Sequence, residues 1–330
     1  MKSAKNSSLF FVMLLLALLL SLYLSLLIGP VETTAADLAN FLFRGEATYR
    51  TIFLDLRLCR ALLAWLVGAS LSLSGVILQG YFQNPMADPF VIGVSSGASF
   101  GAVLCLFFGL EATVVGLPLQ SLCAFASGLG IVSLVYALSR QKPAFKVETL
   151  LLTGIAAGAL TSALTSFLLF MRSDSFEQAV FWLLGSFSLA DWRQVSFVSP
   201  CFALILTLTQ WMAKDMNLLT LGDEVARSLG CPVGRVRLAF LGLSTLLAAL
   251  AVSVSGVIGF IGLIVPHGVR LLVGPDHRRL FLFSPLAGGT FLVLCDLASR
   301  SILSPAELPI GILTAALGAP FFIFLLHRRK

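Results

Sequence analysis

Charged residues divide this sequence into long stretches that contain no Asp, Glu, Lys or Arg. Nine such stretches cover residues 6–31, 61–87, 89–110, 112–139, 149–171, 194–213, 238–269, 280–295 and 308–327. A helix of about 20 residues crosses the roughly 30 Å of hydrocarbon in a bilayer, and most of the stretches are long enough to do so. The pattern predicts an all-α integral membrane protein.

The longest stretch, 238–269, contains signals for a break in its helix. Ser255-Gly256 and Gly259 lie at a natural interruption, and Pro266 further on can interrupt helical hydrogen bonding. We therefore expect this stretch to hold one helix and the start of a return, which gives about ten transmembrane helices in total. The alternative is eight spans, with 238–269 as a single helix and 280–295 lying in the membrane interface.

Basic residues at both ends of the chain predict that both termini are cytoplasmic. Two lysines lie near the start, and the chain ends in Arg-Arg-Lys. Termini on the same side require an even number of spans, which ten provides. In that topology fifteen Lys and Arg residues are cytoplasmic and seven are outside, which together make the 22 in the chain. The asymmetry supports this orientation of a multi-pass membrane protein.

The composition narrows the class of protein further. Of the 330 residues, 58% are hydrophobic and only 12% are charged, and the mean hydropathy is +0.97. Soluble domains are about half apolar and a quarter charged, so a cytoplasmic enzyme is excluded. The net charge of +6 does not indicate nucleic-acid binding, because Lys and Arg lie between the apolar runs and form no basic patch. We predict one transmembrane permease domain over residues 1–330, without a nucleic-acid partner.

Two segments of the chain resemble each other. Residues 74–93 align without gaps on residues 255–274, at an offset of 181 residues. Such a match suggests duplication, although short glycine-rich apolar segments can also match by chance. With five spans between equivalent points the two copies would face opposite ways across the bilayer. The halves of this inverted repeat would cover roughly 57–172 and 235–326, as is common in transporters.

Small residues recur at helical spacing. Gly93, Gly97 and Gly101 are four residues apart, as are Gly154 and Gly158. Glycines at this spacing allow helix backbones to approach closely. Helix packing is the simplest explanation for each glycine taken singly.

The sequence contains no pattern for catalysis, metal binding or ATP hydrolysis. None of its six lysines follows a glycine, so the GxxxxGK[ST] phosphate loop is absent. The three histidines, His267, His277 and His327, form no metal-binding pattern. Any ATP must therefore be used by another subunit. An ion-coupled carrier is disfavoured because ionisable residues lie at the edges of the predicted spans, but backbone carbonyls at broken helices could still hold sodium.

The longest polar segment on the cytoplasmic side is 214–237. Within it, Asp223 is suited to cap a short helix that presents Val225, Ala226 and Leu229, and Gly230 can end that helix. A short helix with exposed apolar side chains suits a groove on a partner protein. It could equally lie back on its own bundle.

Three of the seven basic residues on the outer side lie at the ends of predicted spans, where basic residues run against the expected topology. Arg57 and Arg60 open the second span, and Arg300 precedes the last. Solvated helix ends or contacts with lipid phosphates would explain them. A protein partner that presents carboxylates would explain them too, because arginine forms bidentate pairs with carboxylates.

Ordered motifs along nearly the whole chain resemble the FecCD-type permeases of ABC importers for iron-siderophores, haem and cobalamin. The matching pieces are RLCRALLAWLVGASLSLSGVILQ at 57–79, NPMADPFVIGVSSGA at 84–98, LLTGIAAGAL at 151–160, WLLGS at 182–186, LGDEVARSLG at 221–230, SGVIGFIGLIVPHGVRLLVGPDHRRL at 255–280 and ELPIGILTAALGAPFFIFLL at 307–326. The resemblance implies ten helices in the type II ABC importer architecture, a homodimer around a central pathway, two ATPase subunits and an extracytoplasmic binding protein. ATP and Mg would be used by the ATPase, and this chain would hold no cofactor. The resemblance also implies a multi-pass protein of the cytoplasmic (inner) membrane of a prokaryote.

The resemblance also implies roles for particular residues. Arg57, Arg60 and Arg300 would meet acidic residues of the binding protein. The coupling helix in the ATPase groove would comprise Gly222, Asp223, Glu224, Ala226, Leu229 and Gly230. Gly154 and Gly158 would flank the pathway, with the gate near Asn84, Met86 and the Val147-Glu148 turn. The expected cargo is a ferric siderophore, with haem or cobalamin as the alternative.

Three positions depart from the family's usual pattern. Cys59 replaces the proline between the first two arginines, which leaves the backbone before the second span less constrained. Met86 replaces the leucine of NPLADP, a mild exchange of one flexible apolar side chain for another. Glu148 adds a charge where small polar residues are common in relatives.

Overall fold

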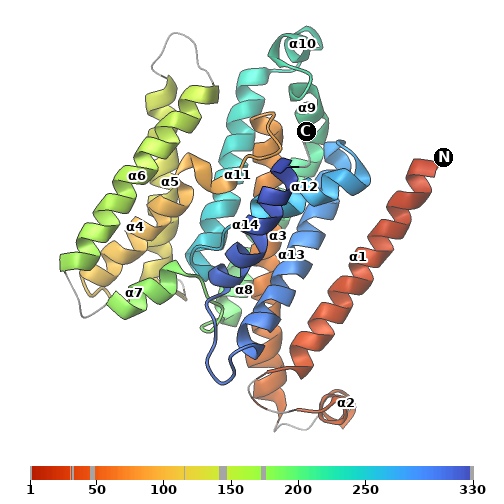
Figure 1. Ribbon diagram of the computed structural model, residues 1–330, viewed down its shortest axis with the longest axis vertical. Coiled ribbons are helices and arrows are strands. Elements are labelled where there is room, and N and C mark those ends of the chain that lie inside the picture. Colours follow the sequence, from red (N-terminus) through yellow and green to blue (C-terminus); the bar gives the residue numbers. More distant parts are fainter. Residues whose placement is uncertain are drawn as a thin grey trace.

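The computed structural model describes residues 2–29, 31, 33–44, 49–114, 116–140, 147–171 and 176–327. The chain forms a bundle of helices, with one two-stranded hairpin in the described part (Figure 1). In chain order the elements are α1 (Lys2–Leu27), α2 (Ala35–Arg44), the π-helix η2 (Thr51–Leu58), α3 (Cys59–Tyr81), the 3-10 helix η3 (Pro89–Ile92), α4 (Val94–Phe107), β1 (Thr113–Val114), β2 (Leu117–Pro118), α5 (Leu119–Arg140), α6 (Val147–Met171), α7 (Phe176–Leu183), α8 (Trp192–Trp211), α9 (Ala213–Leu219), α10 (Asp223–Ser228), α11 (Val233–Ser255), α12 (Ile261–Val273), α13 (His277–Ser301) and α14 (Ile310–His327).

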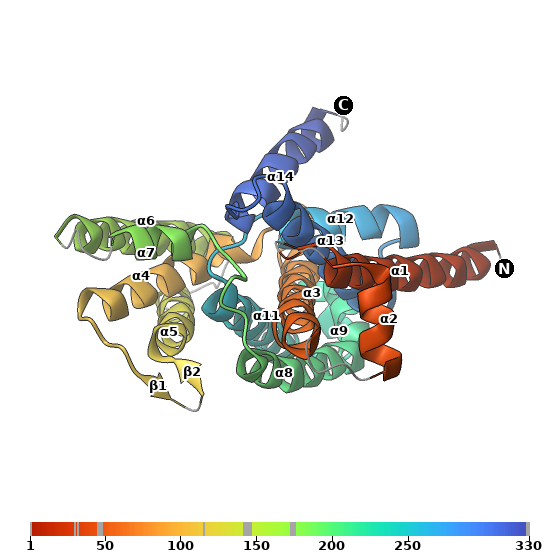
Figure 2. The same ribbon diagram turned by 90° about the horizontal axis from the view of Figure 1, so that it is seen from below.

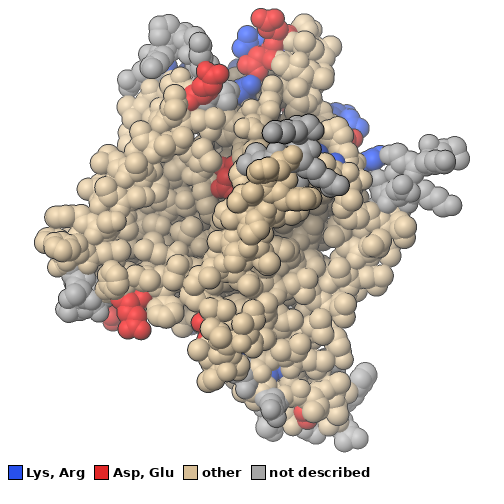
Figure 3. All heavy atoms as spheres, in the orientation of Figure 1, with Lys and Arg blue, Asp and Glu red and all other residues tan. Residues whose placement is uncertain are grey.

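The prediction of about ten membrane-spanning helices is confirmed. Seven helices among the described residues are long and apolar enough to cross a membrane, and three shorter apolar helices, α4, α12 and the apolar part of α14, complete the set. Charged side chains gather at the two ends of the molecule, and most of the surface between them carries none (Figure 3). This distribution is the one expected when a hydrocarbon layer surrounds the middle of the bundle.

The break predicted inside 238–269 is also present. Helix α11 ends at Ser255, and α12 begins at Ile261 after a turn in which Gly256 has a φ of 70°. A Cβ atom at Gly256 would lie 2.1 Å from the carbonyl oxygen of Trp182, so only glycine fits. The alternative in which 238–269 forms a single helix is therefore wrong.

Pro266 does not end its helix, but it interrupts the helical hydrogen bonding as predicted. It lies inside α12, where it has no N–H to donate to the carbonyl of Gly262. The side-chain amide of Gln79 in α3 instead donates to the carbonyls of Gly262, at 3.5 Å, and Leu263, at 3.0 Å. The hydrogen bonding that proline removes is therefore partly replaced by a neighbouring helix.

Helix α3 is the centre of the bundle and is almost wholly buried. Its small residues allow α12 and α13 to approach it closely, since a Cβ at Gly75 would lie 1.8 Å from the carbonyl oxygen of Gly262. The hydroxyl of Ser74 hydrogen-bonds to Ser244 of α11 at 2.8 Å. Helices α4, α5 and α6 form a group on one side of this centre, and α1 lies on the other (Figures 1 and 2).

The order of helices repeats in opposite orientation. The series α3, α4, α5, α6 has lengths of 23, 14, 22 and 25 residues, and the series α11, α12, α13, α14 has 23, 13, 25 and 18. Helices α3 and α11 are antiparallel, because Arg237 at the start of α11 donates to the carbonyl of Tyr81 at the end of α3. The architecture thus contains an inverted repeat of four helices.

The residue-by-residue alignment at an offset of 181 does not match this repeat. It pairs Ser74 and Gly75, inside the straight helix α3, with Ser255 and Gly256, where α11 ends. It also pairs Pro85, in the turn after α3, with Pro266, inside α12. Similar glycine-rich sequence segments therefore adopt different local structures in the two halves.

Candidate functional site

The three predicted outer arginines converge on one pocket at the end of the bundle opposite α10. Arg57 comes from η2, Arg60 from the first turn of α3, and Arg300 from the last turn of α13. The pocket has a volume of about 230 Å³ and is also lined by Phe187 and Glu307. Residues that are almost 250 positions apart in the sequence are thus brought together here.

Arg60 is held by two carboxylates. Its guanidinium donates to Asp296 at 2.8 to 3.1 Å through Nε and Nη2, and to Glu307 at 2.9 Å through Nη1. The side chain of Asp296 is 1% exposed, whereas that of Glu307 is 29% exposed. Arg60 therefore has one buried partner and one that solvent can reach.

The other two arginines fasten the end of α1. Arg57 donates to the carbonyls of Leu26 and Leu27, at 2.6 and 2.9 Å, and so satisfies acceptors that a helix end leaves open. Arg300 donates to the carbonyl and the hydroxyl of Ser25. Its Nε lies 3.9 Å from Asp296.

Of the explanations that the sequence left open for these arginines, solvated helix ends are contradicted by their burial, and docking of a protein partner stays a prediction. Arg57 and Arg300 are only 4% and 3% exposed, and Arg60 is paired within the chain. Sequence reasoning also missed Asp296 and Glu307, which complete the cluster. An acidic residue close to an apolar stretch indicates that its carboxylate is paired with a basic residue. The sequence of its own helix does not show which basic residue that is.

At the other end, α9 and α10 form the polar segment predicted between residues 214 and 237. Asn217 of α9 donates to the carboxylate of Asp276 at 2.7 Å and accepts from the backbone N–H of His277 at 2.9 Å. Burial raises the pKa of Asp276, but hydrogen bonds from Asn217 and from the N–H of Arg278 outweigh that effect and leave the pKa below its usual value. The segment that leads into α10 is thus tied to the start of α13.

Helix α10 and the residues that flank it expose apolar side chains at the tip of the molecule. Leu221, Val225 and Leu229 are 59%, 45% and 58% exposed, and Glu224 also faces outward. Ala226 is completely buried and faces the bundle. Gly230 has a φ of 82° just beyond the helix, which confirms that it lies where the helix ends.

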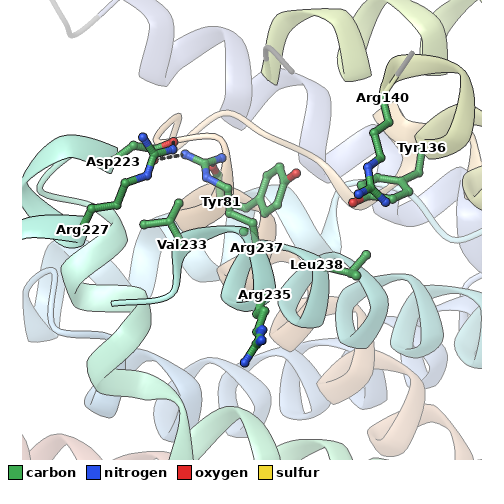
Figure 4. A pocket seen from close by; sticks show the side chains of 10 residues that line it. Tyr81, Tyr136, Arg140, Asp223, Arg227, Val233, Arg235, Arg237 and Leu238 are labelled. Atoms are coloured by element: carbon green, nitrogen blue, oxygen red, sulfur yellow. Dashed lines mark hydrogen bonds and ion pairs between the residues drawn. The ribbon is translucent and has the colours of Figure 1, made fainter. Parts of the chain in front are cut away.

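Asp223 does not cap α10, contrary to the prediction. Gly222, with a φ of 102°, occupies the N-cap position, and Asp223 is the first residue of the helix. The carboxylate of Asp223 instead pairs with Arg237 at 2.7 Å, as Figure 4 shows, and with Arg227 at 3.9 Å. Asp223, which was expected to cap its own helix, therefore links α10 to α11 through an ion pair.

The residues expected at the pathway and gate lie in the turn after α3 and on α6. The side chain of Asn84 accepts a hydrogen bond from the backbone N–H of Met86 at 3.0 Å in the turn after α3. Val147 and Glu148 are the first two residues of α6 and do not form a turn. The six residues that precede them lie outside the described part of the chain.

Gly154 and Gly158 pack α6 against its neighbours. A Cβ at Gly154 would lie 2.8 Å from the carbonyl oxygen of Val91 in η3, and one at Gly158 would lie 3.3 Å from the hydroxyl of Ser96. The predicted packing role of these glycines is confirmed. Their position beside a pathway stays a prediction.

Residues 16–328 match the sequence profile of the FecCD transport family. The chain belongs to this family. It is 42% identical to the cobalamin import system permease protein of Halobacterium salinarum, over 90% of this chain and 79% of that protein. It is 38% identical to the hemin transport system permease protein of Yersinia pestis, over 96% of both chains.

A solved structure has the same fold. It is described as a metal-chelate type ABC transporter in an inward-facing conformation. It is 36% identical in sequence, covers 97% of this chain and 99% of its own, and superposes with a TM-score of 0.83. The FecCD chain described here therefore has the architecture of an ABC transporter permease, and ATP hydrolysis belongs to separate subunits.

Proposed function

We propose that this chain is the membrane-spanning subunit of an ATP-driven importer for a bulky metal chelate. The observation that carries the proposal is that the same packed helices connect two different sites, one at each end of the molecule. The buried arginine pocket lies where α3 begins and α13 ends, and the exposed apolar helix α10 lies where α3 ends and α11 begins. A packed core can transmit movement between such ends because it is not freely deformable. Membership of the FecCD family supports this function.

The proposed orientation places α10 and both termini in the cytoplasm and the arginine pocket outside the inner membrane. The excess of Lys and Arg in the segments on the α10 side supports it, because cytoplasmic loops carry such an excess. Both ends of the chain lie toward the α10 end of the bundle (Figure 1).

A second copy of the chain completes the proposed pathway. Helices α6 and α14 expose large apolar side chains, among them Leu160, Phe167, Leu317 and Phe324. Exposed apolar faces of this kind fit a partner helix as well as lipid. In the homodimer the faces of α6 and α14 would meet around the pathway, with Gly154 and Gly158 beside it. Asn84, Met86, Val147 and Glu148 would lie near its cytoplasmic mouth.

An extracytoplasmic binding protein would dock at the arginine pocket. Arg57 and Arg300 are occupied by backbone carbonyls and would shape the pocket, while Arg60 would provide the recognition. Its partner Glu307 is partly exposed and lies on the segment between α13 and α14. A carboxylate of the binding protein would take the place of Glu307 at Arg60, because both present the same chemistry to the guanidinium.

Replacing Glu307 with glutamine should therefore strengthen docking. The change removes a competing negative charge and leaves the buried Asp296 pair intact. We expect the affinity for the co-purifying binding protein to rise about fivefold, since one exposed charge pair is worth about 1 kcal/mol. The measurement is the dissociation constant of the detergent-solubilised complex. Glu111→Gln removes a charge at the same end outside the pocket and should leave it unchanged. An unaltered or weakened affinity in Glu307→Gln would contradict the exchange.

On the cytoplasmic side, two ATPase subunits would receive α10 of each chain. The exposed Val225 and Leu229 would enter the groove of the ATPase, and Gly222, Asp223, Glu224, Ala226 and Gly230 would shape the helix that carries them. ATP and Mg would bind to the ATPase, and this chain would hold no cofactor.

The cargo we propose first is a ferric siderophore. The similarity to permeases named for cobalamin and hemin supports a chelate as the class of cargo and makes these two the alternatives. A chelate carries its metal already enclosed, so the pathway needs room and no metal ligands of its own.

Purification of the chain in mild detergent from its native membrane under iron limitation tests the function. We expect an ATPase subunit and an extracytoplasmic binding protein to co-purify, and mass spectrometry of the bound small molecule to identify the chelate. Vesicles with the complex should take up that chelate only when ATP is supplied. Recovery of the chain alone, with uptake that follows an ion gradient and ignores ATP, would overturn the proposal in favour of a secondary transporter.

A further inference from the structure

A basic pocket opens at the α10 end of the bundle and is lined in part by charged side chains of α10. It has a volume of about 650 Å³ and lies between the ends of α3 and α5, the start of α11 and helix α10, whose Asp223 and Arg227 line it. Of the described residues that line it, four are arginines and one is acidic. These charged residues are Arg140, Arg227, Arg235, Arg237 and Asp223.

The positive charge of this pocket is only partly neutralised within the chain. Asp223 pairs with Arg237 at 2.7 Å and with Arg227 at 3.9 Å. Among the described residues, Arg140 and Arg235 have no ion-pair partner, and both are exposed. Figure 4 shows the pair of Asp223 and Arg237 on one side of the pocket and Arg140 on the other. A surplus of guanidinium groups around a hollow suits an anion with several acceptor oxygens.

Aromatic rings complete the wall of the pocket. Tyr81 and Tyr136 both line it, and the guanidinium of Arg237 lies 5.1 Å from the centre of the Tyr81 ring. Tyrosines are enriched at the level of lipid head groups, where one end of the ring is apolar and the other is wet. The pocket therefore combines the two residue types typical of a membrane interface.

An apolar groove continues from the basic pocket along α5 and α11. It has a volume of about 220 Å³ and shares Tyr136 and Leu238 with the pocket. Its other lining residues are Leu129, Val132 and Ser133 of α5, and Leu241, Gly242, Thr245 and Leu246 of α11. Positions three and four apart on each helix form one face, so the groove runs along the helix axes toward the middle of the bundle.

Gly242 helps to keep this groove open. A Cβ built at Gly242 has no atom within 4 Å, so the space beside the glycine is empty of protein. Figure 2 shows α5 and α11 displaced from α6 and α14 toward the opposite side of the bundle. The helices that line the groove are thus not the helices proposed to meet a second copy.

We propose that the pocket and groove together bind one anionic phospholipid per chain. The phosphate would lie among the arginines, and an acyl chain would lie against Leu241 and Gly242. The succession of a basic head region and an apolar trough matches the two parts of a phospholipid. A polar loop of a soluble protein would not fill the apolar groove between two membrane helices. Basic pockets between transmembrane helices on the cytoplasmic side are suited to anionic head groups.

The proposal depends on the proposed function only for the side of the membrane, namely the cytoplasmic leaflet. Binding can be measured on the full-length chain without ATPase, binding protein or cargo. A failure of lipid binding is therefore distinguishable from a failure of transport.

Native mass spectrometry of the delipidated chain in mild detergent tests the proposal. The probes are phosphatidylglycerol and phosphatidylcholine with the same palmitoyl and oleoyl chains. We expect one phosphatidylglycerol per chain, bound about tenfold more tightly than phosphatidylcholine, which corresponds to about 1.4 kcal/mol. Inorganic phosphate at millimolar concentration should not displace it, because the acyl chain contributes to binding.

Variants separate the head region from the groove. Arg140→Gln combined with Arg235→Gln should abolish the preference for phosphatidylglycerol. Gly242→Leu should weaken both lipids, because the new side chain fills the groove. Arg193→Gln combined with Lys214→Gln removes two exposed charges outside the pocket and should leave the preference unchanged.

Several outcomes would overturn the proposal. Equal affinity for the two lipids, or an equal loss of preference in the control variant, would show that the basic pocket does not select the head group. Displacement by phosphate alone would mean a small-anion site. Displacement of the lipid by the purified ATPase would assign the pocket to that protein's interface.

Discussion

Replacing Asp296 with alanine should strongly destabilise the protein, so that most molecules lose their fold in detergent. The carboxylate of Asp296 is 1% exposed, pairs with Arg60 at 2.8 Å and lies 3.9 Å from Arg300. Without it, two guanidinium groups are left in a buried site with too few acceptors. Removal of one partner of a buried ion pair costs about 3–5 kcal/mol, a large part of the roughly 5–15 kcal/mol by which a folded protein is stable.

The measurement is the thermal unfolding midpoint of the purified chain, together with the fraction that elutes as a single species. Asp296→Asn, which keeps the shape and loses the charge, should fall between the alanine variant and the original chain. Glu307→Gln alters the exposed partner of the same Arg60 and should shift the midpoint little, because exposed pairs contribute about 1 kcal/mol or less. An Asp296→Ala variant as stable as the original chain would show that the arginines find other acceptors.

This burial also determines how docking can be studied. Substitution of Arg57 or Arg300 by glutamate would place a negative charge beside the backbone carbonyls that now accept their hydrogen bonds. Loss of docking in such a variant could result from misfolding or from loss of recognition, and the measurement would not separate the two. Glu307 is the more informative position, because it can be changed while the buried pair remains.

A second large effect is expected at α10. The double variant Val225→Arg, Leu229→Arg should lose the ATPase subunit and ATP-driven uptake, while it remains folded and still binds the binding protein. Both side chains project from the bundle, so arginines there cost the fold little. In an apolar groove they would be charges without partners, and central interface residues contribute about 2 kcal/mol or more each. We expect the affinity for the ATPase to fall at least about 100-fold, or about 2.8 kcal/mol.

Co-purification of the ATPase and chelate uptake into vesicles are the readouts for this variant. Leu189→Arg combined with Leu303→Arg places two arginines at exposed apolar positions away from α10 and should retain the ATPase. Ala226→Arg is unsuitable, because Ala226 is fully buried and its substitution would disturb the packing of α10. Uptake at the original rate in the double variant would refute the coupling role.

Much of the architecture was predictable from the order of residues alone. A span needs about 20 apolar residues, and such runs are visible without knowledge of the fold. The break after Ser255 was predictable because glycine tolerates the backbone angles of a turn. The limits of α13 were not, because Asp296 and Arg300 lie inside the helix and are neutralised by each other and by Arg60. A rule that ends spans at charges fails where the charges are paired.

The sites depended on the tertiary structure. The sequence pattern identified Arg57, Arg60 and Arg300 as unusual, but only helix packing places Asp296 and Glu307 beside them. It identified Asp223 as a cap, whereas the antiparallel contact of α3 with α11 brings Arg237 within reach of its carboxylate. Periodicity along one helix reports which face is apolar, and it contains no information about the partner that faces it. Membrane insertion follows from local composition, while the arginine pocket and the lipid groove arise from contacts between helices far apart in the chain.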